Sequence, residues 1–219
     1  MKKIISFSLW GGDPKYTLGA LKNADLALEI YPEWICRYYV GKSTPIEIIE
    51  ELKQKQNTEI IEMEDEGSWN SMFWRFYPIG DDDVEIMLSR DCDSRLSKRE
   101  LSCVEEFINS DKLFHSMLDH PWHSGIMGGM WGAKSGILKD IKELINSWNK
   151  NDQWQTDQSF LNNIVRPIVN NTLLMHDSIN LKNFPDKREN YHFVGEVFDG
   201  YDNRYEHYCV LTFPENEGL

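Results

Sequence analysis

The residues best suited to chemistry are two aspartates one position apart in the stretch IMLSRDCDSRL. Asp91 and Asp93 directly follow an apolar run, and Arg90 and Arg95 flank them. Two carboxylates at the end of a strand can approach a single divalent ion, and Mg²⁺ typically binds one or two carboxylates plus substrate phosphates. In the alternative interpretation, the same residues form an acidic loop that only caps the following helix. This stretch alone leaves both interpretations open.

A second apolar segment, TLLMHDS, ends in His176 and Asp177. If both segments are strands of one sheet that run in the same direction, their carboxyl ends meet at the same edge. His176 would then suit a third metal ligand beside Asp93. A lone histidine after a strand is more often a structural residue, so that interpretation competes with the metal site.

Two further stretches have the residue types of a sugar site. In WQTDQSF, Asp157 and Gln158 open an amphipathic helix and would place a carboxylate and an amide in a cleft. Otherwise Asp157 only complements the helix dipole. In IMGGMWGAKSG, paired glycines permit close backbone approach to a ligand, and Trp131, like Trp122, offers a face for a sugar. The alternative is a tight turn beside an ordinary strand.

The elements that must position these residues alternate along the first half of the chain. Strand-like runs occur at KIISFSLW, WICRYYVG, TEIIEM and VEIMLS. Helical spacing occurs at KYTLGALKNADLALEI, TPIEIIEELKQK and GSWNSMFWRFYPI, the last with Ser68 as N-cap. This alternation predicts a mainly parallel sheet with helices on both faces. Ligands of such sheets bind beyond the carboxyl ends of the strands, where Asp91 and Asp93 fall.

The second half is less regular. It predicts helices at KRELSCVEEFINS, ILKDIKELINSWN and DQSFLNNIVRPIV, a strand at TLLMHD, and a polar, aromatic tail with little periodicity. No linker rich in proline, glycine or serine divides the chain, so 219 residues predict a single domain.

Composition limits the function classes. Lysine and arginine total 23 against 36 aspartates and glutamates, which disfavours binding to nucleic acid. The four cysteines, Cys36, Cys92, Cys103 and Cys209, are scattered and indicate reduced thiols. No apolar run approaches the roughly 20 residues of a membrane span, and the N-terminus lacks a signal-peptide cleavage site. We therefore expect a soluble, cytoplasmic protein.

In combination, these motifs resemble the glycosyltransferases of the GT-A fold, which use a nucleotide-sugar donor and a D-x-D metal site. WRFYPI followed by VEIMLSRDCD is similar to their arginine, strand and D-x-D arrangement, and IMGGMWGAKSG looks like their donor and acceptor loop. TDQSFLNNIV resembles the Asp-Gln-led helix of several retaining subfamilies, and MHDS with HFVGE resembles their His-bearing C-terminal segment. The resemblance extends from the first strand to about Glu196. The HxxGxxKPW ending of one large retaining subfamily is not present, which leaves the stereochemical outcome open.

The resemblance implies a single GT-A-like, Rossmann-like domain over residues 1–219, with a nucleotide-sugar-binding half at 1–95 and an acceptor-side half at 96–219. It implies Mn²⁺ or Mg²⁺ as cofactor. Asp93 would bind the ion directly, Asp91 would contact the donor ribose or the ion through water, and His176 would complete the ligands.

The resemblance also assigns residues to the donor. Arg75 would hold the D-x-D loop or reach a donor phosphate, and Trp10 and Tyr16 would line the base and ribose pocket. The loop of Gly128, Gly129 and Trp131 would contact the nucleotide sugar. The donor would be a UDP- or GDP-sugar, and the acceptor a glycan or another hydroxyl compound.

The implied reaction transfers a sugar from the nucleoside diphosphate to the acceptor hydroxyl. Asp157 and Gln158 would lie near the anomeric carbon or that hydroxyl. If the configuration inverts, a carboxylate must act as base, and Asp119 in MLDHPWH is the residue that we expect. If the configuration is retained, an oxygen of the donor phosphate can accept the proton.

Other function classes stay open. A sugar-nucleotidyltransferase shares this sheet and metal chemistry, but usually carries a basic glycine-rich loop after the first strand, and SLWGGDPKYTLG lacks that basic character. A metal-dependent phosphohydrolase would usually need more clustered ligands for two ions. A non-enzymatic carbohydrate-binding module would need the aromatic residues, but not Arg75, the D-x-D pair and His176 together.

Overall fold

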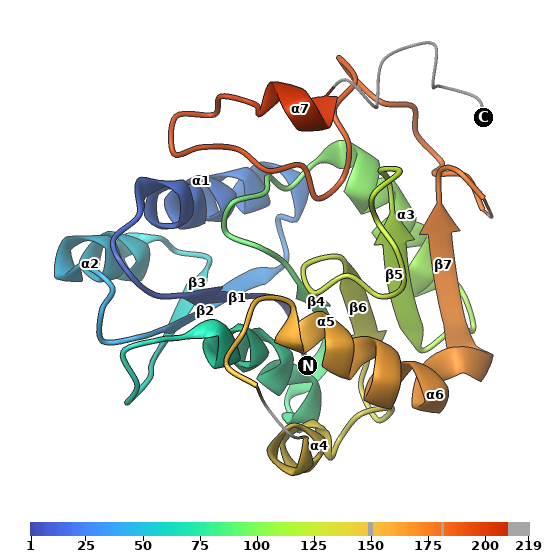
Figure 1. Cartoon of the computed structure of the whole chain (residues 1–219), viewed down its shortest axis with the longest axis horizontal. Coiled ribbons are helices and arrows are strands. Elements are labelled where there is room, and N and C mark those ends of the chain that lie inside the picture. Colours follow the sequence, from blue (N-terminus) through green and yellow to red (C-terminus); the bar gives the residue numbers. More distant parts are fainter. Residues whose placement is uncertain (149–150, 181, 210–219) are drawn as a thin grey trace.

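The apolar runs of the first half form neighbouring strands of one sheet. A computed structural model describes residues 1–148, 151–180 and 182–209, and its seven strands have the order β3-β2-β1-β4-β6-β5-β7 (Figure 1). The strands are β1 (Lys2–Leu9), β2 (Ile35–Val40), β3 (Thr58–Glu62), β4 (Val84–Ser89), β5 (Phe114–Leu118), β6 (Trp131–Lys134) and β7 (Leu173–Asp177). Only β6 pairs antiparallel to its neighbours, so the predicted mainly parallel sheet is confirmed for these residues.

The helices lie between the strands and cover the sheet. They are α1 (Pro14–Ile30), α2 (Ile46–Gln54), α3 (Lys98–Asn109), α4 (Ile141–Ser147), α5 (Thr156–Phe160), α6 (Arg166–Val169) and α7 (Glu206–Cys209). The 3₁₀ helices are η1 (Trp69–Gly80) and η3 (Asn170–Thr172), and η2 (Leu161–Val165) is a π-helical turn between α5 and α6. Ser68 caps η1 as predicted: its hydroxyl accepts from the Asn70 N–H, and the Ser71 hydroxyl accepts from the Ser68 N–H.

Alternation along the strands divides the core into two layers. Ile5 and Phe7 of β1 pack with α1, α2 and α3, whereas the neighbouring Ile4 packs with η1, α4 and α5. This follows from the two-residue period of a strand, which points successive side chains to opposite faces. Helices therefore cover both faces, as the sequence predicted.

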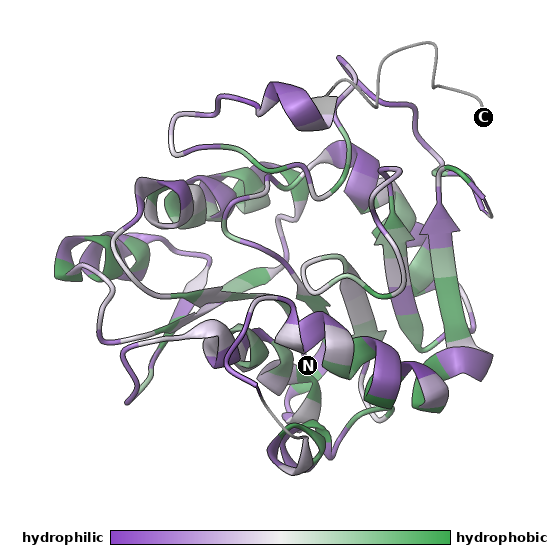
Figure 2. Ribbon diagram, in the orientation of Figure 1, coloured by the Kyte–Doolittle hydropathy of each residue, from purple (hydrophilic) through white to green (hydrophobic). Residues whose placement is uncertain are grey.

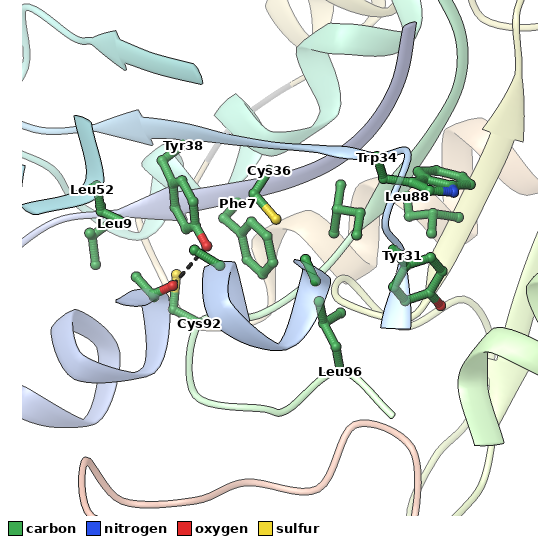
Figure 3. Packing of buried hydrophobic residues seen from close by; sticks show 14 of the residues in the cluster. Phe7, Leu9, Tyr31, Trp34, Cys36, Tyr38, Leu52, Leu88, Cys92 and Leu96 are labelled. Carbon is green, nitrogen blue, oxygen red and sulfur yellow. Dashed lines mark hydrogen bonds between the residues drawn. The ribbon is translucent and has the colours of Figure 1, made fainter. Parts of the chain in front are cut away.

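The α1-side layer fixes that helix against the sheet (Figure 3). Phe7 stacks on Tyr38 with ring centroids 4.8 Å apart, and the buried Tyr38 hydroxyl donates to the Ala20 carbonyl at 2.8 Å. Small residues of α1, including Ala20 and Ala24, are fully buried and allow this close packing. The N-terminal end of α1 is thereby held beside the carboxyl ends of β1 and β4.

The polar tail after β7 crosses above α1 and α3 and ends in the hydrophilic helix α7 (Figures 1 and 2). Phe198 N–H donates to the Asp93 carbonyl at 2.8 Å, and Arg95 donates to the Asp199 carbonyl at 3.0 Å. The tail therefore packs on the D-x-D loop, although the two segments are far apart in the sequence.

The structure bears on two expectations from composition, the state of the cysteines and the presence of membrane-spanning helices. Cys36, Cys92 and Cys103 are buried free thiols, whereas the side chain of Cys209 falls outside the described part of the chain. Among the described helices, none has both the length and the apolar character that crossing a bilayer requires.

Candidate active site

A cavity of about 430 Å³ opens beyond the carboxyl ends of β1 and β4. Ten of the residues singled out from the sequence line it: Trp10, Tyr16, Arg75, Asp91, Asp93, Trp122, Gly128, Gly129, Asp157 and Gln158. Asp119, Trp131 and His176 do not line it. The fold therefore gathers the D-x-D loop, the glycine pair and the Asp-Gln helix at one place.

Helix α1 positions the D-x-D loop. A Cβ atom at Gly19 would lie 2.0 Å from the Cys92 carbonyl oxygen, so only glycine lets the helix pack this closely against the loop. One turn later, buried Asn23 donates to the Ser94 carbonyl at 2.9 Å and accepts from the Leu96 N–H at 3.0 Å. These contacts fix the backbone on both sides of Asp93.

Arg75 is the central charge of the cavity. It projects from η1, where its N–H donates to Ser8 Oγ at 3.1 Å. Its guanidinium pairs with Asp91 through Nη1 and with Asp157 through Nη2, the latter at 2.7 Å. Burial raises the pKa of Asp157, and the positive charge of Arg75 acts in the opposite direction. Arg75 thus holds the D-x-D loop against the α5 N-terminus, one of the two roles that the resemblance implied.

Asp93 has a cation of its own. Lys15 Nζ lies 2.8 Å from Asp93 Oδ2, at the first turn of α1. Burial, followed by the negative charge of Asp91, raises the pKa of Asp93, and the positive charge of Lys15 acts in the opposite direction. Lys15 was missed from the sequence, because its partner is far along the chain.

The glycine pair brings the backbone of the loop before β6 onto these carboxylates. A Cβ atom at Gly129 would lie 1.9 Å from Asp91 Oδ2, and one at Gly128 would lie 2.3 Å from Asp157 Oδ2. Ser89 Oγ at the end of β4 donates to the Gly128 carbonyl at 2.7 Å. Gly128 and Gly129 therefore permit the close backbone approach that the sequence suggested. In this structure the backbone approaches the carboxylates of Asp91 and Asp157.

The donor set for a divalent ion is smaller than predicted. Asp91 and Asp93 both line the cavity, and paired carboxylates suit a hard cation that takes its remaining ligands from phosphate and water. Within the described part of the chain, however, no group of three or more histidine, cysteine, aspartate or glutamate side chains is arranged to hold a metal. The two aspartates would therefore leave most of the ligands of such an ion to water and to the phosphates of a bound substrate.

His176 is not brought to the aspartates. It lies at the carboxyl edge of β7, as expected, but β6 and β5 separate β7 from β4, about 14 Å at the usual spacing between strands. One ring nitrogen lies 2.9 Å from His115 Nε2, and the other lies 3.1 Å from Glu106 Oε2. These contacts correspond to the structural interpretation of His176 and argue against its role as metal ligand.

Asp119 is a fully buried structural carboxylate. Arg99 donates to both of its oxygens at 2.7 Å, and Arg188 and the Val194 N–H add bonds of 3.0 and 2.9 Å. This carboxylate does not line the cavity and both of its oxygens are bonded to Arg99, which argues against the predicted role as base. The bond that Asp119 accepts from the Val194 N–H instead holds the tail in place next to Phe193, which lines the cavity.

Trp131 belongs to the core rather than to a sugar site. It is fully buried and stacks on Phe114 with centroids 5.1 Å apart and planes inclined by 10°. The residue opens β6, and its side chain points into the layer beneath η1. Trp122, by contrast, lines the cavity and is exposed.

Several lining residues were missed from the sequence. His120 and His123 follow β5, and Phe193 and Tyr208 come from the tail. Burial lowers the pKa of His120 and lowers that of His123 to about 4, so both imidazoles are neutral at physiological pH. The cluster of histidines and Trp122 in DHPWHSG was a usable signal, whereas the tail had no periodicity from which to place it.

Comparison with known proteins identifies the fold. No family model matches the chain, and no curated protein matches it in sequence. A glycosyltransferase involved in the glycosylation of the major capsid of PBCV-1 is 16% identical over 83% of this chain and 84% of that one, with a TM-score of 0.54. S. aureus TarS 1-349 in complex with UDP is 15% identical over 84% of this chain and 59% of that one, with a TM-score of 0.56.

A nucleotidyl-type enzyme is also similar. The 4-diphosphocytidyl-2C-methyl-D-erythritol synthase from Anaerococcus prevotii is 9% identical over 83% of this chain and 91% of that one, with a TM-score of 0.54. At such identities the likeness concerns the fold alone. The chain has the GT-A fold, with its mostly parallel sheet in a single domain.

Proposed function

We propose that the chain is a glycosyltransferase that moves a sugar from a nucleoside-diphosphate sugar to an acceptor hydroxyl. The observation that supports this most is that Arg75 joins the D-x-D aspartate Asp91 to Asp157 in one cavity at the carboxyl ends of the strands. On this fold, such a site is where a diphosphate and a sugar would meet. The similar TarS structure contains UDP, which makes a UDP-sugar the first donor to test.

Asp91 and Asp93 would hold a divalent ion, Mn²⁺ or Mg²⁺, which would supply Lewis-acid stabilisation of the leaving diphosphate. The chain's own residues then have distinct roles. Arg75 fixes the positions of Asp91 and Asp157 relative to each other. Trp10 and Tyr16 line the cavity, and the nucleoside would bind against them. Gln158, beside Asp157, would donate a hydrogen bond to the sugar.

The ion pairs favour retention of configuration. Among the described residues that line the cavity, the carboxylates are Asp91, Asp93 and Asp157, and each is paired with Arg75 or Lys15. An inverting enzyme needs an unpaired carboxylate that accepts the acceptor's proton. With Asp119 engaged elsewhere, we expect an oxygen of the donor's own phosphate to accept that proton while the sugar–phosphate bond breaks.

Thermal unfolding with nucleotides tests the proposal. UDP, GDP, CMP and dTDP are added separately, with and without Mn²⁺, to the wild-type chain. A ligand that binds only the native state stabilises it by about 2.7 kcal/mol at a hundredfold excess over its Kd. We expect a Mn²⁺-dependent shift with UDP that is lost in Asp93→Asn and kept in Asp82→Asn, whose side chain is 94% exposed. If no nucleotide shifts the unfolding temperature, the transferase proposal is refuted and a carbohydrate-binding module becomes the preferred function.

The fold neighbour from A. prevotii makes a sugar-nucleotidyltransferase the second function to test. The two activities differ in their substrates, because a nucleotidyltransferase consumes a nucleoside triphosphate and a sugar phosphate and releases pyrophosphate. Pyrophosphate release from UTP or CTP with sugar phosphates, without turnover of UDP-sugars, would select the second activity. Release of UDP from a UDP-sugar would select the first.

A further inference from the structure

The three exposed tryptophans of the described chain all line the same cavity. Trp69, Trp122 and Trp154 are 43%, 58% and 67% exposed, and they come from η1, the loop after β5 and the loop before α5. The other five tryptophans are buried or half-buried. An exposed indole leaves a large apolar surface in water, and a cluster of such surfaces at one opening marks a binding site.

Two of these indoles lie on the acceptor-side half of the chain. Trp122 makes edge contacts with His120 and Tyr208 at centroid distances of 5.4 and 5.6 Å, so its ring is held in place while much of it faces solvent. Trp154 immediately precedes Gln155, Asp157 and Gln158, which also line the cavity. The two rings therefore line the same cavity as the residues that would meet the reacting hydroxyl.

The charge of the cavity restricts what these rings can bind. Arg75 is the single lysine or arginine among the described lining residues, and it is already paired with two carboxylates. The neighbouring His120 and His123 are kept neutral by burial. An acceptor with phosphate, sulfate or carboxylate groups would find no free cation here, on a chain with a net charge of −13.

We infer that the acceptor is a neutral saccharide whose sugar rings stack on Trp122 and Trp154. Sugar rings present apolar C–H faces that suit an indole, and their hydroxyls suit neutral amide and imidazole partners such as Gln158 and His123. A peptide acceptor would also bury aromatic surface, but its backbone groups would need partners, and none of the described lining residues belongs to the edge strands β3 and β7. This inference rests on the proposed transfer reaction and names its acceptor class.

An array of glycans tests it, with the full chain in the presence of saturating UDP and Mn²⁺. The array holds neutral oligosaccharides, sialylated, sulfated and phosphorylated glycans, and unglycosylated peptides. Neutral glycans that bind are then titrated against wild type, Trp122→Ala, Trp154→Ala and Trp122→Phe. Tyr201→Ala is the matched control, because Tyr201 is 74% exposed and does not line the cavity.

We expect neutral glycans to bind, with Kd about tenfold weaker in each alanine variant, equivalent to about 1.4 kcal/mol. Trp122→Phe should retain most of the affinity, and Tyr201→Ala should match wild type. Binding confined to anionic glycans or peptides, no binding to any glycan, or equal affinity in the tryptophan variants would overturn the inference. The nucleotide thermal shift of wild type separates the two proposals. A shift without glycan binding refutes only the acceptor class, whereas glycan binding without a shift refutes the transferase and leaves a saccharide-binding site that includes Trp122 and Trp154.

Discussion

Removing the Arg75 guanidinium should expose how strongly the site depends on it. The side chain of Arg75 is 6% exposed and that of Asp157 is 2% exposed, so their pair is almost fully withdrawn from water. Arg75→Met keeps the length of the side chain and removes its charge. Breaking a buried pair by removing one partner costs about 3–5 kcal/mol, because the remaining charge is left uncompensated. For a chain of this size that corresponds to a fall in Tm of about 6–20 °C.

The deficit should depend on pH with a definite sign. Burial already raises the pKa of Asp157, and the loss of Arg75 raises it further. The folded variant then binds a proton more readily than the unfolded chain, so its stability decreases as pH rises through the folded pKa. We expect a larger deficit at pH 8 than at pH 5, because lower pH favours protonation of the uncompensated Asp157 carboxylate.

Urea unfolding of four chains at both pH values measures this: wild type, Arg75→Met, Asp157→Asn and the double variant. Asparagine removes the buried charge, so the double variant should recover most of the lost stability. Asp91, the other partner, is 41% exposed and regains water when Arg75 is lost. A deficit below about 1 kcal/mol, or one equal at both pH values, would refute this account, because a surface pair has that magnitude.

Three further substitutions test other contacts of the site. Gly129→Ala should abolish the Mn²⁺-dependent UDP shift, because the new Cβ occupies the place of Asp91 Oδ2; an unchanged shift would show that the carboxylate can move freely. Asp119→Asn should lower the free energy of unfolding in urea by about 3 kcal/mol or more, because Arg99 and Arg188 lose a buried partner; a loss of transfer at unchanged stability would instead restore its role as base. Lys15→Met should tighten Mn²⁺ binding to the nucleotide-free chain about tenfold by calorimetry, since Asp93 loses a competing cation; equal affinity would show that the two do not compete.

The sequence predicted the local features of the site well, because they depend on neighbouring residues. Alternating strands and helices imply a parallel sheet, and the end of an apolar run places Asp91 and Asp93 at its carboxyl edge. The same logic placed His176 at that edge correctly. The sequence could not give the distance from His176 to the aspartates, because strand order is set by tertiary packing. Strand β6 pairs antiparallel with β4, and β6 and β5 together separate β7 from β4.

The contacts that the sequence did not predict depend on partners far along the chain. In the sequence Asp119 has no recognisable partner, but in the fold it pairs with Arg99 and with Arg188, which is 69 positions away. In the sequence Lys15 is an ordinary lysine in the first turn of a helix, and it meets Asp93 only because α1 packs against the D-x-D loop. Trp131 and Trp122 both offer an aromatic face for a sugar, and it is the strand pairing of β6 that directs Trp131 into the core. Such differences come from packing, which no local pattern encodes.

The charge balance of the site implies that a diphosphate and a divalent ion bind together. Asp91, Asp93 and Asp157 face Arg75 and Lys15, so three carboxylates oppose two cations. A diphosphate alone would add negative charge to a site that already has an excess. A divalent ion alone would displace Lys15 or Arg75 from partners that they have inside the protein. When both bind, the displaced cations gain phosphate oxygens as partners and the ion gains ligands beyond the two aspartates, so each ligand should increase the affinity of the other by the same factor.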